Sequence, residues 1–413
     1  MVILGQYIKI NFVHSEDIKK KIKLIAKSIF KDIVNIRRHI HKYPELSFSE
    51  KETSKFICAV LDKHEIDYKS NVAGFGVVAM IRCKEQDANV IGVRADMDAL
   101  PIQEQNNIDY KSTNDGVMHA CGHDAHSAML LGTAIILNKI KDNLKGTVKF
   151  IFQPAEEKLP GGASLMIKED VLKFPTVNKM FALHVYPEFK VGLVGFKSGK
   201  YMAACDEIYI DVHGKGGHAA LPDQFINPIT IACEIILKLR SAIANIEPIK
   251  ENYILEFGDF HAHGASNVIP PKATLQGTLR TLDESFRKKT HKIIFDVIRD
   301  IESVTSSKCT VNIKVGYPVL FNNVKLTQSS KKMAQYFLGV DSVKDLDVRM
   351  SSEDFSYFSQ ECESCFFRIG VSNKNLKQSV HHPNFNIDEN CLELGMGLMS
   401  FLVATNLLDQ KRA

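Results

Sequence analysis

The chain has 413 residues, of which 45% are hydrophobic and 24% charged, which is typical of a globular protein long enough for two domains. Its 52 Lys and Arg against 48 Asp and Glu give a net charge of +4, which favours neither a nucleic-acid partner nor an anionic membrane surface. No apolar run approaches the roughly 20 residues of a membrane-spanning helix, and the N-terminus lacks a signal-peptide pattern, so a cytoplasmic location is expected.

The first predicted elements alternate between helices and strands. Isoleucines recur at helical spacing over 15–41, and Pro44 ends this amphipathic helix. Strands are predicted at 76–82, 89–96, 147–152 and 180–185, and helices at 122–141 and 163–170. Strands that alternate with helices indicate a parallel or mixed sheet covered on both faces.

The order of elements changes in the middle of the chain. Strands are predicted at 206–212, 252–260, 273–282 and 309–315, and helices at 225–245, 283–304, 326–338 and 390–408. The order strand, helix, strand, strand, helix, strand matches the split-βαβ, ferredoxin-like unit. We therefore expect an α/β protein in which residues 1–202 and 316–413 form an α/β/α domain with a mixed sheet, and residues 203–315 form an inserted ferredoxin-like domain.

The nine cysteines form no recognisable framework. An odd number in a chain of this size predicts free thiols rather than disulfides. Cys362 and Cys365 make a single CxxC, followed by the apolar Phe366 and Phe367. We expect a structural role for this pair, with a thiol redox sensor as the alternative.

Metal-ligand side chains crowd the stretch MHACGHDAH, residues 118–126. Cys121 and His123 lie two residues apart, and a thiolate and an imidazole are both good ligands for a borderline-soft divalent metal. Asp124 could cap the following helix or orient a histidine. The alternative is a helix cap with ligand-type residues nearby by chance.

Paired carboxylates follow two of the predicted strands. Asp96 and Asp98 lie on one face of a strand end, the place where α/β sheets hold ligands. Glu156 and Glu157 are adjacent, so the backbone must bend between them if both act at one site. One could then bind metal while the other moves protons. Taken alone, each pair could equally be solvated at the surface.

Four histidines and one arginine complete the set of candidates. His184 lies in an apolar strand, where a satisfied core histidine is the simpler interpretation, and His381 and His382 lie in a loop. His218 stands in the glycine-rich stretch HGKGGHAALP, which allows close approach of the backbone but is not a phosphate loop. Arg280 on a strand could clamp a carboxylate, or could be a solvated sheet residue.

Taken jointly and in order, these stretches resemble the M20 family of metallopeptidases and amidohydrolases. The resemblance is closest to the branch of N-acyl-amino-acid amidohydrolases, hippurate hydrolases and indole-acetyl-amino-acid hydrolases. The motifs that carry it are RRHIHKYPELSFSE (37–50), GVRADMDALP, MHACGHDAH, FQPAEE, ALHV, GKGGHAALP, SNVIP, MSSEDFSYF and HHPNF. They cover nearly the whole chain after residue 35.

The resemblance implies two divalent metal ions, zinc or manganese. The implied ligands are Cys121, His123, Glu157, His184 and His381, where the His-x-Pro pattern selects His381 over His382. The resemblance also implies Glu156 as catalytic base, Asp98 as the residue that orients a ligand, His218 as a residue that joins the active site from the inserted domain, and Asn267 and Arg280 as holders of the substrate carboxylate. Asp96 stands where the wider family has a metal-binding histidine and is left out of the ligand set.

These implications predict a binuclear metal-dependent amidohydrolase that splits N-acyl amino acids, such as N-acetyl or N-benzoyl derivatives, into a carboxylic acid and a free amino acid. A dipeptidase or metallocarboxypeptidase could use the same site, and a non-catalytic metal-binding protein is a remote alternative. The expected partners are a small-molecule substrate and further copies of the chain, as a homodimer or homotetramer. Residues 203–315 would then serve as a lid and dimerisation domain.

Overall fold

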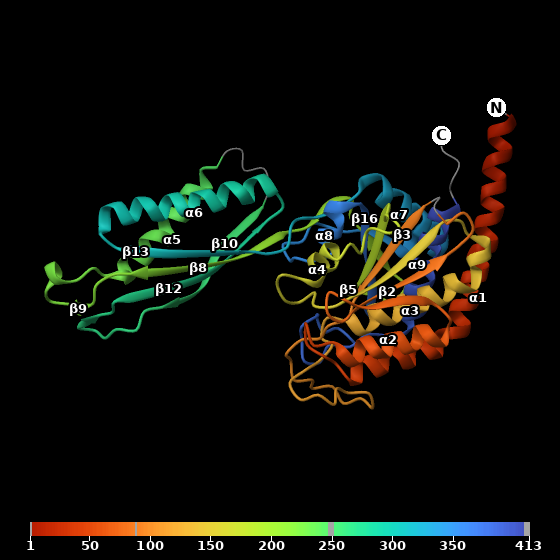
Figure 1. Ribbon diagram of the computed structural model, residues 1–413, viewed down its shortest axis with the longest axis horizontal. Helices are drawn as coiled ribbons and strands as arrows, with labels where there is room; N and C mark the ends of the chain where they lie inside the picture. Colours follow the sequence, from red (N-terminus) through yellow and green to blue (C-terminus); the bar gives the residue numbers. More distant parts are fainter. Residues whose placement is uncertain (1, 87–88, 247–251, 409–413) are drawn as a thin grey trace. The chain divides into compact units, whose positions relative to one another are not determined.

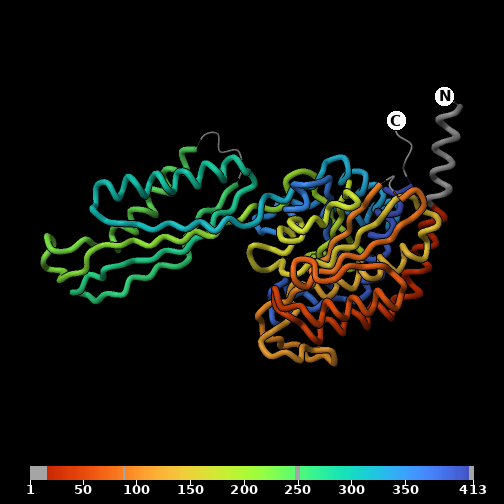
Figure 2. The backbone as a smooth tube through the Cα atoms, in the orientation of Figure 1, coloured from red at the N-terminus to blue at the C-terminus, as the bar shows by residue number. Residues whose placement is uncertain are grey.

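The computed structural model describes the backbone of residues 2–86, 89–246 and 252–408, and the side chains from residue 16 onward within these ranges. The chain divides into two compact units (Figure 1). Unit 1 comprises Met1–Gly199, Phe321–Asp347 and Tyr357–Ala413, and unit 2 comprises Lys200–Leu320 and Val348–Ser356. The segment Val348–Ser356 groups with unit 2, whereas the sequence analysis placed it in the first domain. Figure 2 traces the chain as it leaves unit 1 and returns to it.

Unit 1 is built on an eight-stranded mixed sheet with the order β1-β2-β4-β3-β5-β16-β6-β15. Its strands are β1 (Asp67–Val72), β2 (Gly76–Arg82), β3 (Val90–Asp96), β4 (Thr147–Gln153), β5 (Lys179–Lys190), β6 (Val194–Phe196), β15 (Val343–Asp345) and β16 (Glu363–Ser372). The central strands β4, β3, β5 and β16 run parallel to one another. Every residue of β3 and β4 is buried, so both faces of the sheet are covered, as the sequence predicted.

Seven α-helices belong to the described part of unit 1. They are α1 (Val2–Lys42), α2 (Lys51–Lys63), α3 (His123–Ile140), α4 (Gly162–Lys168), α7 (Val324–Leu338), α8 (Ser356–Glu361) and α9 (Asn390–Leu408). The isoleucine stripe of α1 lies in the core, where Ile22 and Ile33 are fully buried. Helices α1, α3 and α9 pack against one another, and α3 and α9 also contact the sheet.

Helix α9 is long and apolar enough, by length and composition alone, to cross a membrane. This apolar stretch is longer than the sequence-based expectation allowed, which was that no apolar run approaches membrane-spanning length. However, 72% of the 18-residue window that meets this test is buried inside the protein, among α1, α3 and α7. This degree of burial is that of a core helix in a globular unit.

Unit 2 contains a four-stranded antiparallel sheet with the order β10-β12-β8-β13. Its elements in chain order are β8 (Ala204–His213), α5 (Pro228–Ala244), β10 (Tyr253–His261), β12 (Lys272–Thr281), α6 (Glu284–Thr305) and β13 (Lys308–Val315), with a separate strand pair of β9 (Gly217–His218) and β11 (Val268–Ile269). A further pair, β7 (Gly199–Met202) with β14 (Leu320–Asn322), lies where the chain passes from one unit to the other. Asn227 caps α5, whose first residue is Pro228, and Asp283 caps α6. The connectivity is that of the split-βαβ unit.

The CxxC pair lies at the start of β16, a strand that the sequence analysis did not predict. The Cys362 thiol donates to the carbonyl of Phe358 at 3.6 Å, and Cys365 is fully buried. Burial raises the pKa of Cys362 to about 11 and that of Cys365 to about 12, so both remain protonated thiols near neutral pH. All nine cysteines are free, as expected, and the environment of this pair favours a structural role.

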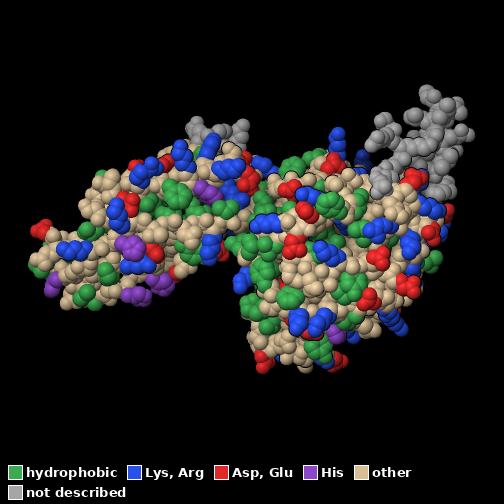
Figure 3. Space-filling view, in the orientation of Figure 1, with side chains coloured by type: hydrophobic (Ala, Val, Ile, Leu, Met, Phe, Trp, Pro, Cys, Tyr) green, Lys and Arg blue, Asp and Glu red, His purple; other side chains and the backbone are tan. Residues whose placement is uncertain are grey.

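Acidic and basic side chains are interspersed over both units on the face shown in Figure 3, as the small net charge suggests.

Candidate metal centre

Side chains from separate segments meet beyond the carboxyl ends of the parallel strands of unit 1. Asp96 ends β3 and Asp98 follows it, while Glu156 and Glu157 follow β4. His184 lies within β5, His381 lies in the segment after β16, and Cys121 and His123 stand at the start of α3. Ligand sites of open α/β sheets are commonly found at this edge.

The five candidate ligands form one cluster. The Sγ of Cys121 lies 3.4 Å from Nε2 of His184, and Nε2 of His381 lies 3.2 Å from Oε1 of Glu157. Three of the sets whose ligand atoms lie within 4.8 Å of one another contain at least two of these residues, namely Cys121 with His123 and His184, Cys121 with Glu157 and His381, and His123 with Glu156 and Glu157. Four of the five ligands are largely shielded from solvent, whereas the side chain of His381 is 50% exposed.

A bend at Ala155 lets both glutamates reach the cluster. Ala155 has a φ of 50°, in the left-handed region, and its N–H donates to Oε1 of Glu50 at 2.7 Å. Its carbonyl accepts from the N–H of Gly162 at 2.8 Å. A Cβ on Gly162 would lie 1.7 Å from the carbonyl oxygen of Pro154, so only glycine fits there. This is the bend that the adjacent pair Glu156 and Glu157 requires.

Asp98 holds two candidate ligands at once. Its Oδ1 lies 3.1 Å from Nδ1 of His123, and its Oδ2 accepts from the N–H of Glu157 at 3.0 Å and from the hydroxyl of Ser47 at 2.6 Å. Burial opposes ionisation of Asp98, but the hydrogen bond from His123 lowers its pKa overall. With Nδ1 of His123 protonated toward Asp98, Nε2 is the nitrogen available for coordination.

His184 is oriented in a similar way. Its Nδ1 donates to the carbonyl of Val185 at 2.8 Å, which leaves Nε2 directed at Cys121. Burial, followed by the charge of Arg368, lowers the pKa of His184, so the ring is neutral, as a metal ligand must be. Gly122 has a φ of 87°, and a Cβ there would lie 2.6 Å from the side chain of Val185. The close approach of α3 and β5 therefore depends on this glycine.

The side chain of Asp96 forms hydrogen bonds with residues outside the set of candidate ligands. Its Oδ2 accepts from Nη1 of Arg94 at 2.7 Å, and its Oδ1 accepts from Nδ1 of His126 at 2.6 Å. The Nε2 of His126 in turn accepts from the N–H of Val185 at 2.9 Å. Asp96 also faces His123, at 3.7 Å between Oδ2 and Nε2. This arrangement gives Asp96 a supporting position beside the ligand cluster.

The cluster fits a divalent cation. Among the described residues, Nε2 of His123 is buried without a hydrogen-bond partner, and Oε1 of Glu157 faces Nε2 of His381 at 3.2 Å. Burial raises the pKa of the Cys121 thiol, and hydrogen bonds with Cys121 and Glu157 raise the pKa of His381 to about 10. The donors are one sulfur, three imidazole nitrogens and a carboxylate, a set suited to zinc and related transition metals.

The remaining candidates lie in unit 2. His218 on β9 is exposed and its Nδ1 accepts from the N–H of Ala220 at 3.1 Å, while the exposed Asn267 accepts, through its carbonyl, from the N–H of Ala219 at 3.0 Å. His218 and Asn267 are therefore close, because His218 pairs with Val268 of β11 and Asn267 directly precedes that strand. Arg280 on β12 donates from Nη1 to the hydroxyl of Ser352 at 3.1 Å.

Arg280 stands at the end of the four-stranded sheet that is remote from the strand pair β9 and β11, which carries His218. Lys272 at the start of β12 pairs with His213, five residues before His218, whereas Arg280 pairs with Cys205 at the other end. The eight steps along β12 from Lys272 to Arg280 span about 27 Å of strand. Arg280 and the end of the sheet that leads to His218 are therefore too far apart for one small molecule to reach both.

Two supporting residues of the site, Ser47 and Glu50, were missed in the sequence analysis. Both lie in the motif RRHIHKYPELSFSE, which helped to establish the resemblance, but no role was assigned to either. The polar residues of this motif were the only signal, because their contacts with Asp98 and Ala155 join segments far apart in the chain.

A buried set of thiol, imidazole and carboxylate groups with an adjacent second glutamate, at the carboxyl edge of a mixed sheet, defines a metal-dependent hydrolase. Residues 92–405 match the family described as peptidase family M20/M25/M40, and the chain belongs to this family. It is accordingly a metal-dependent enzyme that hydrolyses amide bonds.

Relatives with two different activities are similar to this chain over most of its length. Thermostable carboxypeptidase 1 of Saccharolobus solfataricus is 36% identical over 387 residues, covering 92% of this chain and 96% of the relative. N-acetyl-L-cysteine deacetylase of Bacillus subtilis is 36% identical over 363 residues, covering 88% and 85%. The crystal structure of a dinuclear metal-binding M20 peptidase from Bacillus subtilis superposes with a TM-score of 0.79 at 33% identity, covering 93% of this chain and all of that one.

Proposed function

We propose that this protein is a binuclear metal-dependent amidohydrolase that releases a carboxylic acid and a free amino acid from N-acyl amino acids. The observation that carries the proposal is the convergence of Cys121, His123, Glu157, His184 and His381 around one point, with Glu156 beside them. The similarity to an N-acetyl-L-cysteine deacetylase supports the acyl-amino-acid class, and the similarity to a dinuclear peptidase supports two ions.

The residues divide into two sets for two ions. Cys121, His123 and His184 would hold one, and Cys121, Glu157 and His381 the other, so the thiolate of Cys121 is common to both sets. Zinc or manganese is proposed, and the thiolate favours zinc. A divalent cation bound there would polarise the amide carbonyl and lower the pKa of an attacking water.

The residues of the chain carry the proton transfers and the binding of substrate. Glu156 takes a proton from the attacking water and returns it to the leaving amine nitrogen. Asp98 keeps Nδ1 of His123 protonated and Nε2 directed at the cluster. Arg280 and Asn267 bind the free carboxylate of the amino acid, and His218 donates a hydrogen bond to the developing oxyanion.

The division of labour between the two glutamates is directly testable. Glu156→Gln is expected to abolish turnover and keep bound metal, whereas Glu157→Gln is expected to lose metal. Metal content by elemental analysis and turnover of an N-acetyl amino acid are the two measurements. Near wild-type activity of Glu156→Gln would show that the assignment of the base is wrong.

The acyl preference is resolved by a substrate panel. N-acetyl and N-benzoyl amino acids should be cleaved with higher kcat/KM than dipeptides and longer peptides. The second candidate function is that of a carboxypeptidase, which the similarity to thermostable carboxypeptidase 1 favours. Faster release of C-terminal residues from peptides would establish that alternative.

We propose further that the enzyme works as a dimer in which one subunit supplies His218 and Asn267 to the active site of the other. The support is the length of β12 from Arg280 to Lys272, whose partner His213 leads to His218, because this length exceeds that of an N-acyl amino acid. Mixing the inactive variants Glu156→Gln and His218→Ala tests this arrangement. Exchange of subunits should restore about one quarter of wild-type activity, because half of the dimers are mixed and each has one intact site. No recovery after confirmed exchange would exclude it.

A further inference from the structure

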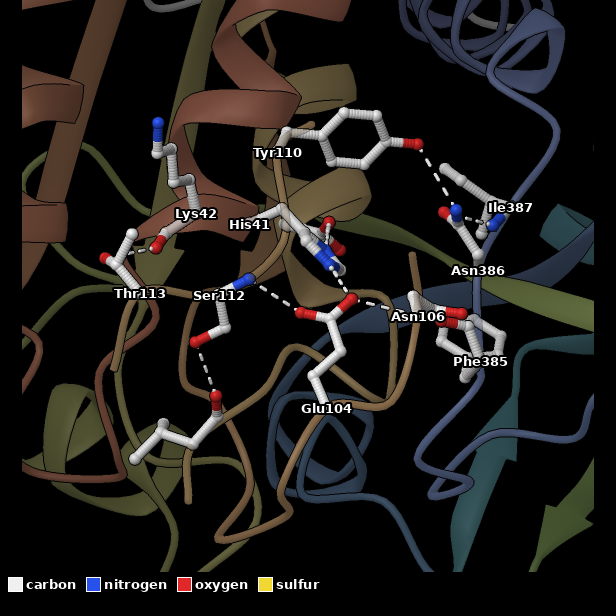
Figure 4. Close-up of polar contacts among 12 residues, drawn as sticks. His41, Lys42, Glu104, Asn106, Tyr110, Ser112, Thr113, Phe385, Asn386 and Ile387 are labelled. Carbon is white, nitrogen blue, oxygen red and sulfur yellow. Dashed lines mark hydrogen bonds and ion pairs between the residues drawn. The ribbon is translucent and has the colours of Figure 1, made fainter. Parts of the chain in front are cut away.

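A network of buried charges adjoins the metal-ligand cluster of unit 1 through Asp124, the residue after His123. Arg37 and His41 of α1, Glu104 of the loop after β3 and Asp124 of α3 are each at most 1% exposed. His41 contacts Asp124 through Nδ1 at 2.7 Å and Glu104 through Nε2 at 3.1 Å. The Nε of Arg37 donates to Asp124 at 2.7 Å. Figure 4 shows His41 facing Glu104.

Stability alone does not account for this network. Burying four charged groups costs solvation energy, and replacing such groups with well-packed apolar side chains is often neutral or stabilising. Burial and Arg37 oppose the charged form of His41, but hydrogen bonds with Asp124 and Glu104 raise its pKa overall. His41 therefore joins two carboxylates in a fixed geometry.

Asn106 connects this network to another part of the chain. Its Nδ2 donates to Oε1 of Glu104 at 2.9 Å and to the carbonyl of Phe385 at 3.0 Å (Figure 4). Next to it, the N–H of Gln105 donates to the carbonyl of Pro383 at 2.9 Å. The side chain of Asn106 thus ties a buried carboxylate to the backbone of the segment that follows β16.

Asn386 makes a second connection between the network and the same segment. Its Oδ1 accepts from Nη2 of Arg37 at 3.0 Å. Its Nδ2 donates to the hydroxyl of Tyr110 at 3.2 Å, as Figure 4 shows. Both connections reach a stretch, residues 373–389, in which the structure contains neither helix nor strand.

This irregular stretch carries His381, the most exposed of the five candidate ligands. His381 has a φ of 64°, an uncommon conformation for a residue other than glycine, and its N–H donates to the carbonyl of Ala120 at 2.7 Å. No ladder of a strand or turn of a helix fixes its position. The hydrogen bonds from Asn106 and Arg37 tie this stretch to the buried network, in addition to the backbone bonds from Gln105 to Pro383 and from His381 to Ala120.

We propose that the chain His41–Glu104–Asn106 positions His381 for metal binding, by fixing the loop of residues 381–389 against a buried ion-pair network. This inference rests on the proposed function, because it takes His381 as a metal ligand. His41, Glu104 and Asn106 are positioning residues, since they act through the loop and touch neither substrate nor metal. Their loss weakens the affinity for metal and leaves the chemistry of the fully loaded enzyme nearly unchanged.

The test compares metal binding by Asn106→Leu and by Thr113→Val. Asn106→Leu removes both donors at similar volume, while Thr113→Val removes only the bond from Oγ1 of Thr113 to the carbonyl of Lys42, which joins the same loop to α1 without reaching residues 381–389. Zn²⁺ or Mn²⁺ is titrated into metal-free enzyme by calorimetry, with chelator competition for tight binding. Asn106→Leu should weaken the Kd of one ion about 10- to 100-fold, and Thr113→Val should match wild type.

Activity at saturating metal provides the second readout. With enough metal to fill the weakened site, kcat of Asn106→Leu should return to within about threefold of wild type, because Glu156 is undisturbed. An unchanged metal Kd, or a kcat that stays low at saturating metal, would overturn the inference. Asn386→Ala removes the hydrogen bonds with Arg37 and Tyr110 and should likewise weaken metal binding while kcat at saturating metal is kept. This variant replaces Asn106→Leu in the test if Asn106→Leu does not fold.

His381→Ala separates the failure of this inference from that of the proposed function. If His381→Ala leaves metal binding unchanged, His381 is not a ligand, and both the ligand assignment and the inference fail. If His381→Ala weakens metal binding and neither Asn106→Leu nor Asn386→Ala does, only the positioning role is wrong.

Discussion

Oε1 of Glu50 accepts a hydrogen bond from the backbone N–H of Ala155 at 2.7 Å, between residues 105 positions apart in the chain. Ala155 is held in the left-handed region with a φ of 50°, a conformation that costs free energy for a residue with a Cβ. The hydrogen bond from Ala155 to Glu50 offsets this conformational cost at the bend that brings Glu156 and Glu157 to the same site. A fully buried carboxylate thereby supports the proposed catalytic base through the backbone.

Glu50→Ala is expected to lower kcat, because the bend at Ala155 loses its partner and Glu156 is displaced. Displacement of a reacting group by about 1 Å can cost about 100-fold in rate. Glu50→Gln keeps an oxygen that can accept from Ala155 and should stay within a few fold of wild type. Steady-state kinetics of both variants check the prediction, and equal losses of kcat would show that the charge of Glu50 matters rather than the hydrogen bond.

The stability of the metal-free enzyme should depend on the ionisation of Glu50. Burial, together with the charge of Asp98, raises the pKa of Glu50 from 4.5 to about 7. A carboxyl group whose pKa is raised on folding holds its proton more tightly in the folded state, so its effect is to reduce stability as pH rises from 4.5 to 7. The full loss is about 3 kcal/mol for a shift of this size.

The control for this pH dependence is Glu50→Gln, which cannot ionise. Its free energy of unfolding, measured with urea in the presence of a chelator, should exceed that of wild type at pH 8 by more than it does at pH 5. A difference that stays constant across this range would show that Glu50 does not carry the effect.

Asp206 in unit 2 should make an acid-sensitive contribution to stability. Burial opposes its charge, but hydrogen bonds from Arg287 and His291 lower its pKa from 3.8 to about 2. Its contribution is therefore present above pH 3.8 and is lost as pH falls toward 2. Asp206→Asn should cost about 2–4 kcal/mol near neutral pH, since the buried Arg287 loses its buried counterion and keeps only the more exposed Glu284.

Asp211→Asn is the matched comparison for Asp206→Asn. Asp211 pairs with Lys272 at 3.0 Å on the same strand, β8, but both side chains are at least 40% exposed. Its loss should cost less than about 1 kcal/mol. Equal destabilisation by the two variants, measured by denaturant unfolding, would contradict the role of burial.

Cys121→Ala should reduce the metal content, because Cys121 belongs to both sets of candidate ligands. Loss of at least one ion per chain is expected at stoichiometric zinc. Cys233→Ala, at an exposed thiol in unit 2, should retain full metal content. Elemental analysis after gel filtration gives the answer, and unchanged stoichiometry in Cys121→Ala would remove Cys121 from the site.

Local patterns in the sequence were enough to predict most of the elements around the site. The strands 76–82 and 89–96 and the helices 122–141 and 390–408 agree closely with β2, β3, α3 and α9. Strand β16 was missed, because a short continuous apolar run has no periodicity that separates a strand from a buried helix. Helix α2 was also missed, although it follows the motif that contains Ser47 and Glu50.

The sequence by itself determined which residues are able to bind a metal and which family pattern they follow, because those properties depend on side-chain chemistry and order along the chain. Only the tertiary structure decided that Glu50 supports Ala155, that Asn106 reaches the loop of His381, and that Arg280 lies at the end of the four-stranded sheet remote from the strand pair of His218. These contacts depend on how strands register and helices pack. Such long-range geometry is set by the whole core and leaves no periodic signal in any one segment.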